Sequence, residues 1–154
     1  MFKLIALTVL LALSGANAFW TRCADLPNAV APREITSPSC SGTSCTVTRG
    51  QTLTANAFAT FTQVHHRLDV RVRVFVLGVG IEIPMDPPND NACNSLLLNG
   101  VQHGCPTTPG VEKVWVINMP VSQLTPAVSN ARVRFELLEN SATVACADVT
   151  ATIL

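Results

Sequence analysis

Apolar and polar residues alternate along most of this chain, and the pattern is clearest in residues 68–84. In the first half of this stretch the apolar residues occupy every second position: Leu68, Val70, Val72, Val74 and Val76. Asp69, Arg71 and Arg73 fill the first three gaps, so a strand here has one apolar and one charged face. After Phe75 the phase changes and glycines separate the apolar residues, which is typical of a bend or turn. We therefore predict a central hairpin or bent strand pair of an all-β domain.

The same alternation predicts strands at residues 19–23, 33–37, 51–62, 112–121, 131–138 and 143–153. Turn-forming residues fill 38–45, and residues 139–142 are a plausible tight turn. Residues 85–110 are too long for an ordinary hairpin loop, and a bridge between Cys93 and Cys105 would make them a stiff lobe. Seven or eight short strands with no helical pattern predict an immunoglobulin-like β-sandwich of two antiparallel sheets.

The strand at 51–62 has an inner face made mostly of small residues: Leu53, Ala55, Ala57, Ala59 and Phe61. Such a face fills little volume, which is compatible with close packing, the commoner outcome, or with an apolar cavity. The residues expected to face between the sheets, with a subset lining any cavity, are Leu53, Ala55, Ala57, Phe61, Val74, Val76, Ile81, Ile83, Trp115, Ile117, Val121, Phe135 and Leu137.

Residues 1–18 have the pattern of a secretory signal peptide. Lys3 precedes an apolar run that is too short for a membrane anchor, and a small-x-small ending follows at Ala16 and Ala18. Cleavage there leaves residues 19–154, a length that suits a single domain with one core. We expect a secreted, extracellular product without stable membrane insertion.

Charge is sparse, with only 13% of residues charged and ten basic against ten acidic residues in the whole chain. Loss of Lys3 with the signal peptide leaves a net charge of about −1, and no Lys/Arg cluster exceeds the alternating Arg71 and Arg73. This distribution argues against a nucleic-acid or anionic-membrane partner.

All six cysteines follow the signal peptide, and an even number in an exported chain indicates three disulfides. Cys40 with Cys45, and Cys93 with Cys105, each flank turn-rich sequence that can fold back locally, which leaves Cys23 with Cys146. A zinc site is the alternative, disfavoured by the spacing and the exported context.

The sequence offers no convincing catalytic or cofactor site. Adjacent strand residues point to opposite faces, so His65 and His66 cannot share one ion, and all three histidines, including His103, are expected at the surface. The acids Asp69, Glu82, Asp86 and Glu136 are expected on outer faces or loops, which gives little support for a paired-carboxylate hydrolase. We therefore expect a protein that is not an enzyme and binds neither metal nor cofactor.

Several segments together resemble one known family. The cysteine order and the stretches SPSCSGTSCTVTRGQT, LGVGIEIPMDPPNDNAC, GCPTTPG and INMPV are similar to the ML family of lipid-recognition domains. Within it, the chain looks most like arthropod Niemann-Pick type C2 proteins, with group 2 mite allergens as relatives. The resemblance covers the whole mature chain and implies the same three disulfides.

The resemblance implies a tunnel between splayed sheets for a sterol, fatty acid or semiochemical. Position by position, it assigns entrance roles to Ile83, Val121 and Thr125, the last before Pro126. Ile83 and Thr125 replace family aromatics, so the implied entrance is less aromatic than that of a sterol carrier. The chain also has no Asn-x-Ser/Thr glycan acceptor, which favours an extracellular over a lysosomal carrier.

Two functions are compatible with this sequence. The first is a secreted lipid carrier, with a possible transient lipid-donor or receptor partner. The second is an extracellular interaction module or innate-immune lipid co-receptor of the same fold. The low charge and the lack of a basic patch favour the carrier, because lipid phosphates need cationic partners.

Overall fold

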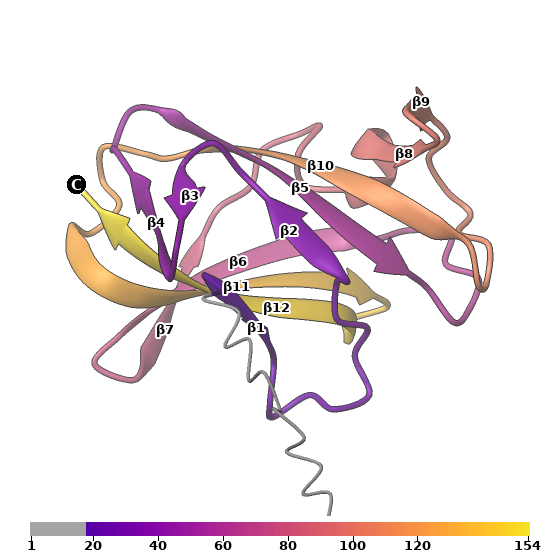
Figure 1. The fold of residues 1–154 in the computed structure, drawn as a ribbon, viewed down its shortest axis with the longest axis horizontal. Helices are drawn as coiled ribbons and strands as arrows, with labels where there is room; N and C mark the ends of the chain where they lie inside the picture. The colour runs from indigo at the N-terminus through magenta and orange to yellow at the C-terminus, as the bar shows by residue number, and fades with distance from the viewer. Residues whose placement is uncertain (1–17) are drawn as a thin grey trace, which may run out of the picture.

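The computed structural model describes residues 18–154, which form two facing β-sheets (Figure 1). The expected signal peptide therefore lies outside the described residues, apart from Ala18. The strands are β1 (Trp20–Arg22), β2 (Glu34–Thr36), β3 (Cys40–Ser41), β4 (Ser44–Val47), β5 (Thr52–Thr60), β6 (Asp69–Val76), β7 (Val79–Ile83), β8 (Leu96–Leu98), β9 (Val101–Gln102), β10 (Glu112–Pro120), β11 (Val128–Glu139) and β12 (Ala142–Ile153). The all-β sandwich is confirmed.

The larger sheet has the strand order β3-β4-β12-β11-β6-β7, and β1 pairs with another part of β12. The smaller sheet has the order β2-β5-β10-β8-β9. Nearly all pairs are antiparallel, but β4 runs parallel to β12, with Ala151 opposite Cys45. The predicted antiparallel arrangement thus holds for the other strand pairs, and β4–β12 is the exception.

The hairpin predicted as central lies at the edge of the larger sheet. β6 pairs with β11 on one side and with β7 on the other, and β7 is the last strand of the sheet. Leu77 and Gly78 form the turn, both with positive φ (50° and 79°). The long β11–β12 hairpin occupies the middle instead, because its two strands are the longest in the sheet and pair along most of their length.

The three expected disulfides are confirmed: Cys23–Cys146, Cys40–Cys45 and Cys93–Cys105. The first joins the N-terminal segment to β12, and the second closes the β3–β4 hairpin, where only a loop was expected. The third fixes the lobe between β7 and β10, which contains a short 3₁₀ helix, η1 (Ala92–Ser95). This lobe lies at the opposite end of the sandwich from the β6–β7 turn (Figure 1).

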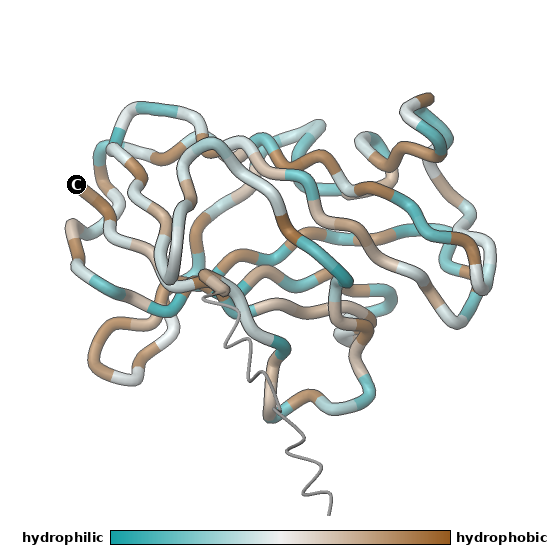
Figure 2. The backbone as a smooth tube through the Cα atoms, in the orientation of Figure 1, coloured by the Kyte–Doolittle hydropathy of each residue, from teal (hydrophilic) through white to brown (hydrophobic). Residues whose placement is uncertain are grey.

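The core lies between the sheets and follows the predicted alternation. Val72 and Val74 of β6 are fully buried, and Trp115 and Ile117 of β10 and Phe135 of β11 are buried. Hydrophobic and hydrophilic residues alternate along the strands in Figure 2. Within residues 18–154, no helix is long and apolar enough to cross a membrane.

Candidate functional site

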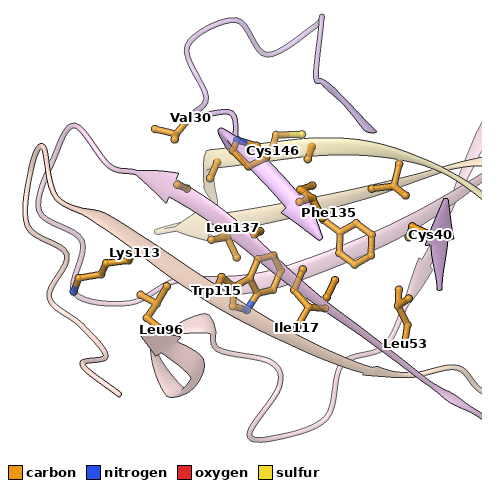
Figure 3. A pocket seen from close by; sticks show the side chains of 18 of the residues that line it. Val30, Cys40, Leu53, Leu96, Lys113, Trp115, Ile117, Phe135, Leu137 and Cys146 are labelled. Atoms are coloured by element: carbon orange, nitrogen blue, oxygen red, sulfur yellow. The ribbon is translucent and has the colours of Figure 1, made fainter. Parts of the chain in front are cut away.

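An apolar cavity of about 50 Å³ lies between the two sheets (Figure 3). Alternate residues of β5 and β10 form one wall, and alternate residues of β11 and β12 form the other. Alanines dominate both walls: Ala55, Ala57 and Ala59 on β5, and Ala145 and Ala147 on β12. Because alanine reaches only one carbon beyond the backbone, the sheets enclose space here instead of interlocking fully.

A second apolar hollow of about 20 Å³ continues from the first toward the β6–β7 hairpin. It shares Leu53 and Phe135 with the cavity, and adds Val74, Ile83 and Val121. The last three residues also line a much larger open groove of about 520 Å³. The three spaces therefore form a series of apolar-lined hollows from the surface into the core.

The groove lies between the β6–β7 hairpin and the connection from β10 to β11. Its apolar part includes Ile81, Ile83 and Val121, and its polar part includes Asn89 and Thr125. Thr125 is buried, and its backbone N–H donates to the carbonyl of Ser122 in a tight turn. The groove is thus a mixed apolar and hydroxyl- or amide-bearing entrance to an apolar interior.

The structure distributes the predicted site residues over these connected spaces. Eight line the cavity: Leu53, Ala55, Ala57, Phe61, Trp115, Ile117, Phe135 and Leu137. Five line the groove: Val74, Ile81, Ile83, Val121 and Thr125. Val76 is half-buried against the core and lines none of the three spaces.

The prediction is wrong for one residue that was expected to face between the sheets. Ile81 is 40% exposed and lies at the groove, not between the sheets. It alternates in phase with buried Ile83, but it lies closer to the turn of an edge hairpin that extends past the opposite sheet (Figure 1). Alternation predicts which face a side chain occupies, but not whether a second sheet covers that face.

The closed interior is narrower than the expected tunnel. Its two spaces measure about 50 and 20 Å³, whereas a cavity that accepts one benzene molecule has about 150 Å³. A lipid-sized ligand therefore requires the sheets to separate or the lining side chains to rotate. The open groove, at about 520 Å³, already has the size of a small-molecule site.

Sequence reasoning missed several lining residues. The cavity also contacts Phe19, Val30, Pro32, Ile35, Leu96, Lys113, Ala145 and Ala147. Strand phase could have identified Lys113, which is two residues from Trp115 on β10, although a lysine is rarely buried. Lys113 is 1% exposed, and burial lowers the pKa of its ammonium group.

The strongest charge pairs lie on the outer face of the larger sheet, away from the cavity. Glu136 is buried on that face and accepts hydrogen bonds from Arg71 and Arg73 at 2.7–3.1 Å. Burial favours a higher pKa for Glu136, but the bonds from the two guanidinium groups outweigh it and lower the pKa. These ion pairs fasten β6 to β11, so their role is structural.

The surface expectation is wrong for His65, which is 5% exposed. Its Nδ1 lies 2.7 Å from Oε2 of Glu139, and its ring meets Phe61 edge-on at 5.6 Å. Its backbone N–H donates to Oγ1 of Thr107, which is far away in the sequence. His65 thus joins three distant segments beside the cavity. Within residues 18–154, no group of three or more His, Cys, Asp or Glu side chains could hold a metal ion.

Comparison with known proteins identifies the family. Residues 17–153 match the family model described as ML domain. The chain belongs to the ML domain family. Among solved structures, the fold is similar to a Niemann-Pick type C2 protein from the Japanese carpenter ant, with a TM-score of 0.72 and 18% identity. That match covers 88% of this chain and 98% of the ant protein.

A second similar structure is chicken MD-1 complexed with lipid IVa, with a TM-score of 0.51 and 17% identity. This match covers 85% of each chain. A search of curated proteins finds no match. At these identities the structural matches show the ML domain fold alone.

Proposed function

We propose that this ML domain is a secreted carrier that binds a hydrophobic small molecule between its two sheets. One observation carries the proposal: apolar side chains line three hollows in series, from the open groove to the cavity among the alanines. Such a path removes an apolar ligand from water, which gains about 0.8 kcal/mol for each buried methylene. A sterol, fatty acid or semiochemical satisfies this chemistry.

Ile83, Val121 and Thr125 would form the entrance in this carrier. All three line the groove, and Ile83 and Val121 also line the hollow behind it. The ligand tail would enter past the two apolar residues, and its polar end would stay near the polar residues of the groove. Because the interior is narrow, a flexible chain needs less separation of the sheets than a rigid ring system.

Binding, not catalysis, is the proposed activity of this chain. The cluster of Arg71, Arg73 and Glu136 consists of ion pairs that join β6 to β11. It lies on the face of the larger sheet that points away from the cavity. Three disulfides are typical of proteins that mature in an oxidising compartment, which supports secretion.

A second candidate, an extracellular lipid co-receptor or interaction module, is favoured by one observation at the groove. Leu77 is 100% exposed, Leu124 is 91% exposed and Val79 is 66% exposed. Leu124 lines the groove, and Leu77 and Val79 belong to the hairpin that forms one of its sides. Figure 2 shows hydrophobic residues at this hairpin. Exposed apolar residues beside a lipid entrance are suited to a lipid donor or receptor.

Native mass spectrometry of the protein isolated from its own tissue tests the proposal. The carrier predicts a population with a bound hydrophobic molecule, which organic extraction removes and added lipid restores. Ligand-free protein that binds neither a fluorescent sterol nor a fluorescent fatty acid would refute it. A complex found only with a protein partner would favour the second candidate.

A further inference from the structure

Lys113 lies at the end of the cavity farthest from the groove. It belongs to β10, on the same face as Trp115 and Ile117. Figure 3 shows Lys113 and Leu96 together at one end and Leu53 at the other. Val121, at the groove, is eight residues along the chain, about 26 Å away for an extended strand. The methylene stem of Lys113 therefore borders the last part of the apolar path.

The ammonium group of Lys113 is held by three acceptors outside the cavity. Nζ donates to the carbonyls of Gly104 at 2.9 Å and Pro106 at 3.1 Å, and it lies 2.9 Å from Nδ1 of His103. An ammonium has three N–H donors, so all of them are used. Within residues 18–154, no carboxylate lies within ion-pair distance of it. Moving Nζ toward the cavity would strand a buried charge, which is strongly unfavourable.

The acceptors are themselves fixed to the sandwich. The backbone N–H groups of His103 and Gly104 both donate to the carbonyl of Leu96, a residue that pairs with Trp115 across β8 and β10. The Cys93–Cys105 disulfide closes the same segment. The lobe therefore holds Nζ in place, and the stem of Lys113 cannot swing aside as the stem of a surface lysine can.

We infer that Lys113 sets the length of the alkyl chain that this ML domain accepts. The inference rests on the proposed carrier function. The alkyl chain of a ligand that enters from the groove runs along β10 and meets the fixed methylene stem of Lys113 beside Leu96. A shorter alkyl chain leaves part of the cavity unfilled, and a longer one leaves methylenes in the groove. The end of the cavity therefore selects ligands whose alkyl chains fall within one range of lengths. The positive charge itself plays no part in ligand contact, because it points out of the cavity.

A homologous series of straight-chain fatty acids from decanoic to eicosanoic acid tests this inference, with the matching 1-alkanols in parallel. Affinity is measured for the mature, disulfide-bonded protein by displacement of a fluorescent fatty acid. For the original protein we expect affinity to rise about fourfold per methylene up to a limiting length and then to level off or fall. In Lys113→Ala the rise should continue for about three further methylenes, the number of stem methylenes that alanine lacks.

Two further variants separate the possible outcomes. Lys113→Met keeps a stem of similar length but loses the clamp, so the limit should become less sharp without moving to much longer chains. Met119→Ala removes a similar side chain from the same face of β10, away from this end, and should lower affinity without shifting the limit. Lys113→Met also serves if Lys113→Ala fails to fold. If affinity then stops rising at the same alkyl-chain length, and as abruptly, in Lys113→Met as in the original protein, the inference is overturned.

The remaining outcomes separate failure of this inference from failure of the carrier function. An unchanged length limit in a folded Lys113→Ala protein contradicts the inference while leaving the carrier function intact. An effect on the acids alone, with the alkanols unaffected, makes Lys113 a carboxylate partner and also overturns it. If no chain of any length binds the original protein, the carrier function fails instead.

Discussion

Trp115 of β10 and Phe135 of β11 meet edge-to-face across the gap between the sheets, with ring centroids 6.4 Å apart at 72°. Both rings line the cavity and come from opposite sheets, so their contact helps to set the present separation of its walls. A lipid-sized ligand that fills the cavity requires these rings to move apart with the sheets or to rotate.

Phe135→Leu should therefore weaken the fold and improve ligand access. We expect a loss of about 1–3 kcal/mol in the free energy of unfolding, from the missing aromatic pair and the added space. Fluorescent fatty-acid binding should be faster, because less of the interior must rearrange. Phe75→Leu is the control. Phe75 lies on the outer face, where Cζ of Arg132 is 3.9 Å from the centroid of the Phe75 ring. Loss of this ring should leave the binding kinetics unchanged. Slower binding in Phe135→Leu would contradict this account.

Val121→Trp tests the entrance. Val121 is buried at the inner end of a groove of about 520 Å³, which has room for an indole. Binding of a fluorescent sterol or fatty acid should fall at least several-fold, while the melting temperature changes little. Val116→Trp adds the same ring to the outer face of β10 and should leave binding unaffected. Equal affinity for the original protein and Val121→Trp would place the entrance elsewhere.

The sequence predicted the strands and inner-facing residues well because alternation depends on local chemistry. Leu53, Ala57 and Phe61, on or just after β5, are buried as expected, because this face lies opposite β11 and β12 of the other sheet. Ile81 follows the same rule but is exposed, because the covering sheet does not extend over the tip of the β6–β7 hairpin. How far a facing sheet extends depends on loop lengths and packing, which alternation does not encode.

Residues with distant partners were the hardest to place. His65 is buried because Glu139 and Thr107 supply its hydrogen bonds, and neither is near it in sequence. Lys113 is buried because carbonyls from the disulfide-closed lobe surround its ammonium group. The side-chain types suggested solvent exposure, and only the tertiary structure shows that buried acceptors are available.

The disulfides should contribute unequally to stability. Cys23–Cys146 closes a loop with a sequence separation of 123, and Cys40–Cys45 one with a separation of only 5. The chain-entropy estimate is about 5 kcal/mol for the long loop and about 2 kcal/mol for the short one. Replacing both cysteines of the long bridge by serine should therefore lower the denaturation midpoint more than the same change in the short bridge. Equal midpoints would contradict the estimate.

Asp25 should make stability depend on acid pH. Hydrogen bonds from Arg134, at 2.6 and 2.8 Å, lower the pKa of Asp25 to about 2. An unfolded aspartate titrates near 3.9, so the contribution is present above about pH 4 and is lost as the pH falls toward 2. Because Asp25 is largely exposed, solvent screens the pair and the effect should be modest.

Comparison with Asp25→Asn tests whether the contribution of Asp25 to stability is lost as the pH falls. The stability difference between the original protein and the variant should be constant near neutral pH and shrink between about pH 4 and pH 2. NMR titration of the Asp25 carboxyl group gives its pKa in the folded protein directly. A value at or above that of an unfolded aspartate would show that Arg134 does not stabilise the ionised form.

Leu77→Asn should stabilise the protein, because Leu77 occupies a backbone conformation that leucine disfavours. Its φ is 50° in the β6–β7 turn, where the next residue, Gly78, also has a positive φ. Two-residue turns of this kind favour Asn-Gly, as at Asn99 and Gly100 between β8 and β9. Leu77 is fully exposed, so asparagine removes no buried contact. Relief of the left-handed strain, which costs leucine about 1–2 kcal/mol, should raise the free energy of unfolding by up to that amount. Urea denaturation measures the change, and an unchanged or lower midpoint would mean that the exposed leucine makes a stabilising contact that the fold does not reveal.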